Sequence, residues 1–453
     1  MTRAHLTLIV RGASYELSLR YLADDARPFD FLVDGVLLRS SLEALLQERQ
    51  ISAEALLEIE YIPAFTPPKP GDIHPHDEWV AAAAGRAASG SAASTSYWVA
   101  SGSYDGILRF YKPGQQAPAF QVAAHAGAIT ALRLVPATGK NTGSSLMVSA
   151  GKDRTARLWS VAVGKDGASV QSCTALAAYT GAEDSIQAVA VSPHGDRCAL
   201  GGWDGSVRLY RCGEAAAAAA AEAGGSTPAG KKKRKGEEGK VVEVAEAPAL
   251  EPTGSCSGHT QCVSGLSWVE DRFLYTGSMD HTVRRWDLAG GQTCVDTLNT
   301  ARAVHCIAAC PASHGERQSY WLCYQMAGAS SPSLTHPSTT HHAGKLVAIG
   351  GAERTVRVWD PRNKGPENQI SIKGLTSHTE WVSSLSWCPG SEHQLVSGSY
   401  DGSIKVWDVR AAVPLATIEG AHSDKVLCVD WFAKGAIASG GADCQLRVHT
   451  IDL

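Results

Sequence analysis

The sequence predicts an all-β ring of seven blades that follows a small α+β domain. Three observations lead to this prediction. One phrase recurs seven times, each copy reads as two strands joined by a tight turn, and the first 62 residues lack the phrase. The phrase is seen in SGSYDGILRFY at 101 and SGSYDGSIKVWD at 397, where small residues lead into a turn and then into alternating apolar and polar positions.

Each copy of the phrase places an acidic residue six positions before a ring-bearing residue. The acidic residues are Asp105, Asp153, Asp204, Asp280, Glu353, Asp401 and Asp443, and the rings belong to Tyr111, Trp159, Tyr210, Trp286, Trp359, Trp407 and His449. Five copies also have a His four residues before a β-branched residue that begins a further strand, namely His76, His125, His259, His378 and His422. Two blades, the third and the fifth, lack this His.

The pattern resembles the WD-repeat family, in which the turn Asp, the upstream His, a Ser or Thr and the strand Trp form a buried hydrogen-bonded set. Asp401, His378, Ser397 and Trp407 match all four positions. A buried carboxylate and imidazole must satisfy each other, because an unpaired buried charge is costly. We therefore interpret the repeated His and Asp residues as structural, since an active site needs one singular constellation in a cleft.

Ring closure defines the domain boundaries. A blade needs four strands, and the sequence ends four residues after His449, so the last blade needs an outer strand from the segment before the first blade. We assign that strand to roughly Glu60 to Pro70. The predicted organisation is an N-terminal domain at 1–62, a Pro-rich linker at 63–77 that contains part of the outer strand, and the propeller at 78–453.

Two insertions are expected, because seven blades of about 40–45 residues need fewer residues than 78–453 provides. Segment 213–252 is rich in Ala, Gly, Glu and Lys and is predicted to be a disordered loop. Its basic run, Lys231, Lys232, Lys233, Arg234 and Lys235, is typical of nuclear-import peptides, with a solvated charge run as the alternative. The second insertion, near 311–344, contains His336, His341 and His342, but a flexible Ser and Pro tract gives no fixed ligand geometry for a metal.

The N-terminal domain follows a strand, hairpin and helix pattern. Apolar strands are predicted at 6–10 and 15–19, Asp34-Gly35 is a hairpin turn, and Ser40 with Glu43 forms a capping box before a helix. The LLEIEY segment then returns as a strand. This order looks like a ubiquitin-like β-grasp, although only the nine residues at 20–28 are available for its crossover helix. Either that helix is reduced to a turn or a segment is missing.

The overall composition narrows the function classes. A net charge of -4 gives little support for direct RNA contact, and no apolar run is long enough to cross a bilayer. The N-terminal apolar stretch is too short for a signal peptide, so we expect an intracellular protein with free cysteines. The nearest approach to a ligand pair is Cys306 with Cys310. We expect no cofactor, no metal of its own and no enzymatic activity.

The pairing of this N-terminal domain with a seven-bladed propeller and a basic insertion after the third blade closely resembles one family. It comprises the WD-repeat ribosome-biogenesis factors that join the pescadillo and block-of-proliferation proteins and carry a Notchless-like N-terminal domain. The segments that carry the resemblance are FDFLVDGVLLRSSLEALL, ISAEALLEIEY, HDEWV, WVSSLSW and DKVLCVDW. The resemblance implies a trimeric complex on nucleolar and nucleoplasmic precursors of the large ribosomal subunit, needed for maturation of precursor ribosomal RNA.

The same resemblance implies that the AAA-type ATPase midasin grips the N-terminal domain through a metal ion that takes an acidic ligand. The family motif Ser-Ser-Glu matches Ser52-Ala53-Glu54 here, so Glu54 would be that ligand, although residue 53 departs from the motif. A hard divalent cation with an open position favours a carboxylate oxygen. The alternative is that Glu54 is only a solvated acid at a helix start.

A competing hypothesis is a substrate receptor of a cullin-type ubiquitin ligase. Trp359-Asp360-Pro361-Arg362 and Trp407-Asp408-Val409-Arg410 fit the WDxR box of such receptors. An Arg after the Trp-Asp of a blade is also common in propellers generally. Co-purification with a ligase adaptor or with a pescadillo-type protein would discriminate the two hypotheses.

Overall fold

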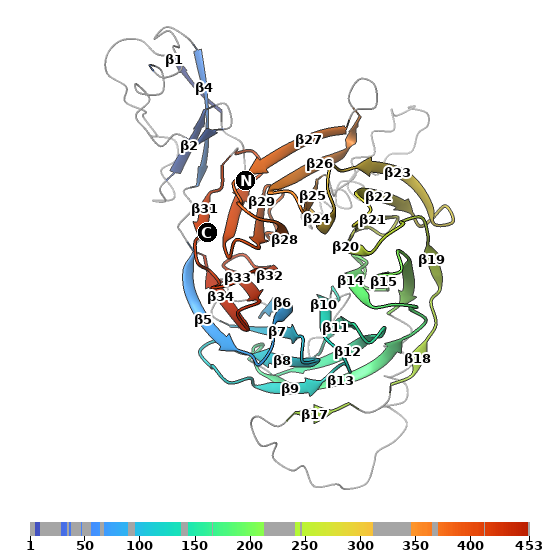
Figure 1. Ribbon diagram of the computed structural model, residues 1–453. Helices are drawn as coiled ribbons and strands as arrows, with labels where there is room; N and C mark the ends of the chain where they lie inside the picture. The colour runs from blue at the N-terminus through green and yellow to red at the C-terminus, as the bar shows by residue number, and fades with distance from the viewer. Residues whose placement is uncertain are drawn as a thin grey trace, which may run out of the picture.

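Seven blades, each with four antiparallel strands, are arranged around a central channel, as the computed structural model shows (Figure 1). Two of the blades carry a fifth, parallel strand at the outer edge. Apart from four strands and residue 47 of the N-terminal domain, the described residues are 68–88, 96–136, 144–164, 166–212, 241–244, 247–310, 346–364, 370–411 and 413–451. Each blade runs from an innermost strand at the channel to an outermost strand at the periphery. The predicted seven-bladed all-β propeller is confirmed.

The strands of the first three blades have the following bounds. Blade 1 contains β6 (Val80–Ala87), β7 (Tyr97–Ser103), β8 (Ile107–Tyr111) and β9 (Phe120–Ala123). Blade 2 contains β10 (Ile129–Leu134), β11 (Ser144–Gly151), β12 (Ala156–Val163) and β13 (Val170–Tyr179). Blade 3 contains β14 (Ile186–Val191), β15 (Arg197–Gly202), β16 (Val207–Arg211) and β19 (Gly254–Cys256).

The remaining four blades repeat this order. Blade 4 contains β20 (Val263–Glu270), β21 (Phe273–Ser278), β22 (Thr282–Asp287) and β23 (Thr293–Asn299). Blade 5 contains β24 (Val304–Ala309), β25 (Val347–Gly351), β26 (Thr355–Lys364) and β27 (Ile370–Thr376). Blade 6 contains β28 (Val382–Trp387), β29 (Gln394–Ser399), β30 (Ile404–Asp408) and β31 (Ala416–Ile418). Blade 7 contains β32 (Val426–Ala433), β33 (Ala436–Gly441), β34 (Gln445–Thr450) and β5 (Lys69–Pro75).

The ring is closed by β5, which pairs antiparallel with β34 at the outer edge of the last blade (Figure 1). This strand lies further along the chain than the expected Glu60 to Pro70, because residues up to Pro63 belong to a strand of the N-terminal sheet. The register shifts between Arg447 and His449, where Gly71 faces the backbone of Val448. A Cβ on Gly71 would lie 2.5 Å from the Val448 carbonyl oxygen, so this position requires glycine.

The core is divided into packets between neighbouring blades. One packet joins Trp98 and Phe110 of blade 1 to Met147 and Trp159 of blade 2, all of them buried. The next packet joins blade 2 to blade 3 around Tyr179. Because the alternating apolar positions of each strand face the adjacent blade, every blade depends on two neighbours for burial, and a closed ring leaves none with a bare face.

Part of the insertion predicted to be disordered is ordered. After blade 3's third strand, the chain returns through β17 (Val242–Glu243), which pairs parallel with β9, and β18 (Ala249–Leu250), which pairs parallel with β13 (Figure 1). It then enters β19 as the outer strand of blade 3. Residues 213–240 and the second insertion at 311–345 lie outside the described residues.

The N-terminal domain is described as one sheet in the order β1 (His5–Ile9), β4 (Leu56–Pro63), β2 (Phe29–Val33) and β3 (Val36–Leu37). Val33 pairs with Val36, and the predicted turn residues between them, Asp34 and Gly35, lie outside the described residues. The LLEIEY segment is the central strand β4, paired with β1 and β2. The strand predicted at 15–19 and most of the helix predicted from residue 40 lie outside the described residues. The ubiquitin-like fold stays a prediction.

No helix of the described part of the chain is both long and apolar enough to pass through a membrane.

Candidate functional site

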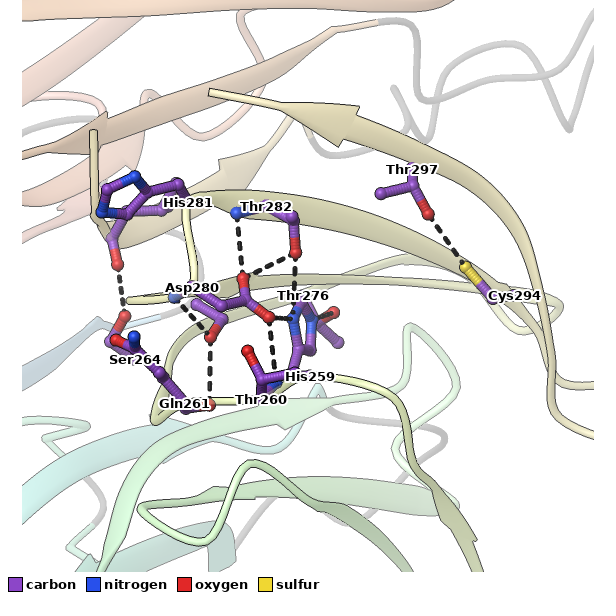
Figure 2. Close-up of polar contacts among 12 residues, drawn as sticks. His259, Thr260, Gln261, Ser264, Thr276, Asp280, His281, Thr282, Cys294 and Thr297 are labelled. Atoms are coloured by element: carbon purple, nitrogen blue, oxygen red, sulfur yellow. Dashed lines mark hydrogen bonds and ion pairs between the residues drawn. The ribbon is translucent and has the colours of Figure 1, made fainter. Parts of the chain in front are cut away.

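The polar set of blade 4 shows how the repeated residues are used (Figure 2). His259 Nδ1 lies 2.8 Å from Asp280 Oδ2, and His259 Nε2 lies 2.6 Å from Thr276 Oγ1. Trp286 Nε1 donates to the same Thr276 oxygen at 2.9 Å. Because the Thr276 hydroxyl oxygen accepts a hydrogen bond from the Trp286 indole, the Thr276 hydroxyl donates its own proton to His259 Nε2. His259 Nδ1 then carries the proton that is donated to Asp280.

The same four-residue set recurs in blades 2 and 6. In blade 2, His125 bridges Asp153 and Ser149, and Trp159 donates to Ser149. In blade 6, His378 Nδ1 lies 2.9 Å from Asp401, and Ser397 Oγ lies 2.7 Å from both His378 Nε2 and Trp407 Nε1. The Asp carboxylates also accept backbone N–H groups of the turn and of the loop after each His, as Asp401 does from Ser403 and Thr379. Each set therefore joins two loops to two strands.

Blades 7 and 1 depart from this pattern. In blade 7, His422 joins Asp443 to Ser439, but His449 Nε2 takes the place of the indole at 3.2 Å from Ser439 Oγ. In blade 1, His76 Nε2 lies 2.7 Å from Ser101 Oγ and 3.3 Å from the Tyr111 hydroxyl. Asp105 pairs instead with Arg109, at 2.7 Å.

Blades 3 and 5, which lack the upstream His, satisfy their acidic residue with an Arg four positions later. Arg208 donates to Asp204 at 2.8 Å, and Arg357 donates to Glu353 at 2.6 and 2.9 Å. Sequence reasoning missed this replacement, because Arg occupies the fourth position after the acid in six of the seven copies and so does not by itself mark the blades that lack the His. Trp359 remains buried in blade 5.

These contacts determine how the carboxylates titrate. Burial acts to raise the pKa of Asp280, but hydrogen bonds from Thr282 and His259 outweigh it and lower the pKa to about 2. The pKa of Asp153, Asp401 and Asp443 is likewise lowered, with His donors overcoming the effect of burial. Burial, together with the charges of His422 and Arg447, lowers the pKa of His449 to about 4.

We expect the free energy of unfolding to fall between pH 6.5 and 4 because of His449. Its pKa is lower in the folded chain, so the unfolded chain binds more protons in this window and stability is lost as the pH falls. His449 is 2% exposed, and the contribution is on the order of 3 kcal/mol. Urea unfolding of a His449→Tyr variant should show a flatter profile, since Tyr occupies this position in blades 1 and 3. A profile identical to that of the natural chain would contradict the assignment.

Nothing in these sets is arranged for chemistry. Each His and each carboxylate is engaged by neighbours within its own blade, and the arrangement repeats around the ring. Within the described residues, no group of three or more His, Cys, Asp or Glu side chains is placed to hold a metal ion. The sets are interpreted as supports for the loops on one face of the ring.

That face surrounds one mouth of the central channel. The channel has a cavity volume of about 260 Å³ and is lined by the innermost strands β6, β10, β14, β20, β24, β28 and β32, with Met279, His305 and Tyr400 at its mouth. In every blade, the residue before the turn acid donates its backbone N–H to a carbonyl in the loop that precedes the innermost strand; the pairs include Tyr104 with Trp79 and Tyr400 with Trp381. These pairs lie at equivalent positions around the mouth. Trp79 and Trp381 hold the acceptor position in blades 1 and 6, and Trp203 holds the donor position in blade 3. All three tryptophan side chains are exposed.

The residues expected to contact partners are not placed by the structure. Glu54 and the basic run from Lys231 to Lys235 lie outside the described residues. The exposed tryptophans at the channel mouth were not singled out by sequence reasoning. For Trp79 and Trp381, the shared motif HDEWV at 76 and HTEWV at 378 was the available signal, whereas Trp203 lies in GGWDG and does not share it.

Comparison with known proteins gives a consistent result. The WD domain, G-beta repeat family matches residues 117–160, 173–211, 250–287, 369–408 and 412–450. The chain is similar to the "ribosome biogenesis protein WDR12 homolog" of Chlamydomonas reinhardtii, with 39% identity over 97% of this chain and 91% of the relative. The proteins of the same name from Oryza sativa subsp. japonica and Arabidopsis thaliana are 35% and 34% identical, over 99% and 93% of this chain and 90% and 85% of the relatives.

Proposed function

Because the chain belongs to the family of WDR12 ribosome biogenesis proteins, we propose that it is a non-enzymatic assembly factor of the large ribosomal subunit. The observation that carries the proposal is the similarity over nearly the whole chain, which includes both the N-terminal domain and the ring. A rigid closed disc whose repeated polar residues are all used internally supports a role in holding other proteins.

In this proposal the propeller is part of a trimeric complex with pescadillo-type and block-of-proliferation-type proteins on pre-ribosomal particles. The complex would serve maturation of precursor ribosomal RNA in the nucleolus and nucleoplasm, and the basic run from Lys231 to Lys235 would direct nuclear import. The N-terminal domain would be the handle through which the ATPase midasin removes the factor, with Glu54 as the ligand to the metal ion of the ATPase.

The linker between the domains bears on this mechanical role. The segment PAFTPPKPGDIHPHD contains closely spaced prolines, which limit its bending, and its second half is the closing strand β5. A pull on the N-terminal domain would therefore reach the ring through β5 and its pairing with β34.

The ligase-receptor hypothesis gains no support from the described contacts. The guanidinium of Arg410, the last residue of one WDxR segment, donates to Asp408 of the same segment at 2.8 Å. That Arg is thus engaged inside its own blade.

The experiment is an affinity purification of the tagged full-length chain from nuclear extract, compared with Glu54→Ala and Glu54→Asp variants. The natural chain should recover the pescadillo-type and block-of-proliferation-type proteins together with large-subunit precursors. We expect Glu54→Ala to lower recovery of midasin at least tenfold, since even outer partners of metal ligands are worth about 10–100-fold in metal affinity. It should also accumulate on precursors, while Glu54→Asp retains a carboxylate and partial recovery.

Each outcome separates parts of the proposal. Equal recovery of midasin by Glu54→Ala and the natural chain would remove the role of Glu54 but leave the complex. Recovery of a ligase adaptor in place of the pescadillo-type protein would overturn the assembly-factor proposal.

A further inference from the structure

Two blades carry the same exposed motif at the channel mouth. Residues 76–80 of blade 1 and 378–382 of blade 6 read HDEWV and HTEWV, and blade 7 lies between these blades in the ring. Trp79 and Trp381 are each 43% exposed, which is unusual for so large an apolar side chain in a fold that buries Trp98, Trp159, Trp407 and Trp431 almost completely. Exposed aromatic groups of this kind mark binding surfaces.

The two tryptophans are held in fixed positions by other rings. Trp381 lies between His305, with ring centroids 5.4 Å apart, and Tyr400, at 5.9 Å, and both contacts are stacked. Trp79 lies against Tyr104 with centroids 5.4 Å apart. The His305 Nε2 atom is buried and has no hydrogen-bond partner among the described residues. We call Trp79, Tyr104, Trp381 and Tyr400 the aromatic rim.

Each tyrosine of the aromatic rim has a lysine ammonium over its ring. Lys152 Nζ lies 4.5 Å from the Tyr104 ring centroid, and Lys425 Nζ lies 5.3 Å from that of Tyr400. No such cation is recorded over Trp79 or Trp381 within the described chain. An exposed indole is the best cation–π acceptor among the side chains.

Carboxylates accompany both indoles. Glu78 directly precedes Trp79, and Glu380 directly precedes Trp381. Both glutamates are exposed, and neither has an ion-pair or hydrogen-bond partner in the described part of the chain. Between them, the loop of blade 7 adds exposed Asp424 and Glu419. Lys425 is the single Lys or Arg in the loops that precede the innermost strands of these three blades.

We propose that the aromatic rim and its two glutamates bind an extended, arginine-bearing peptide segment of a partner protein. A guanidinium is planar, stacks on an indole and forms a forked pair with a carboxylate, so each Glu-Trp unit fits one Arg side chain. The repetition of the unit on either side of blade 7 fits a segment with two such residues. This surface is independent of Glu54 and of the ATPase.

Single-stranded nucleic acid also stacks on exposed aromatic rings, but it needs a positively charged groove for its phosphates. The carboxylates of Glu78, Glu380 and Asp424 would repel phosphates at this place. The charge therefore favours a cationic peptide, and RNA becomes an outcome that the experiment can detect.

The experiment measures fluorescence anisotropy of fluorescein-labelled RGGRGGRGG with the full-length chain, beside KGGKGGKGG, EGGEGGEGG and a ten-nucleotide uridine RNA. We expect the Arg peptide to bind at least tenfold more tightly than the Glu peptide and to weaken as salt is raised. Trp79→Ala and Trp381→Ala should each weaken binding about fivefold, the loss of one cation–π contact. The isosteric pair Glu78→Gln with Glu380→Gln should weaken it by a similar factor.

Trp203→Ala is the control, because Trp203 is 49% exposed but lies in blade 3, outside the aromatic rim. Trp203 holds the position of Tyr104 and Tyr400, and Ser185 takes the place of the rim tryptophan there. Trp203→Ala should change binding less than twofold, and thermal unfolding should show that all variants fold. Equal binding of the Arg and Glu peptides, unchanged binding by the double Trp79→Ala and Trp381→Ala variant, or tighter binding of the RNA with the same dependence on these tryptophans would each overturn the proposal.

Discussion

Valine in place of Gly71 should open the ring at the seam between β5 and β34. Any Cβ at this position meets the Val448 carbonyl oxygen at 2.5 Å, and because that atom is backbone, only a shift of β5 can relieve the contact. We expect a loss of about 3 kcal/mol in the free energy of unfolding, at the upper end for overpacking. Urea unfolding gives the loss, and limited proteolysis should show faster cleavage near residues 64–76.

Gly290→Val is the control for this prediction. A Cβ on Gly290 would meet nothing closer than 3.5 Å, and the residue lies in an exposed turn of blade 4. Its free energy of unfolding should change by no more than about 0.5 kcal/mol. If Gly71→Val were as stable and as protease-resistant as the natural chain, the closing role of β5 would be wrong.

Removing the carboxylate of Asp401 should destabilise blade 6 far more than removing that of Glu353 destabilises blade 5. Asp401 accepts from the buried His378, from the Thr379 backbone and from Ser403. Asp401→Ala would remove the close acceptor of a buried imidazole N–H and leave it only the Ser403 hydroxyl oxygen at 3.4 Å, at a cost of about 3 kcal/mol.

Glu353, by contrast, is bound by Arg357, whose side chain is 30% exposed and can turn to water when the partner is removed. Glu353→Ala should therefore cost about 1 kcal/mol or less. Urea unfolding of the two variants at neutral pH makes the comparison. Equal losses would mean that the His-centred set adds nothing beyond an ordinary exposed ion pair.

The sequence predicted the ring because each repeated residue type occupies the same place relative to the strands from blade to blade. A strand begins at Val80, Ile129, Val263, Val382 and Val426, each four residues after a His, because the His must reach back to the turn acid from the loop before the innermost strand. The turn acid lies between the second and third strands of each blade, and the ring-bearing residue six positions later lies on the third strand.

What could not be predicted lacks such a pattern. The closing strand KPGDIHP contains two prolines and no apolar alternation, so its position followed only from the need for a fourth strand and was placed too early. The strands β17 and β18 pair through two residues each, which is too short to show a period. Trp79 and Trp381 resemble core residues in composition, and only the fold shows that they face outward.

Closure by β5 also dictates the order of events while the chain is being made. Pro75 pairs with Gln445, so the first blade-forming strand emerges about 370 residues before its partner exists. At about 5–20 residues per second, the strand would remain an unpaired edge for roughly 20–70 s of synthesis. During that interval the blades at the two ends of the incomplete arc each expose an apolar flank, which makes the nascent chain vulnerable to aggregation until its final segment leaves the translating ribosome.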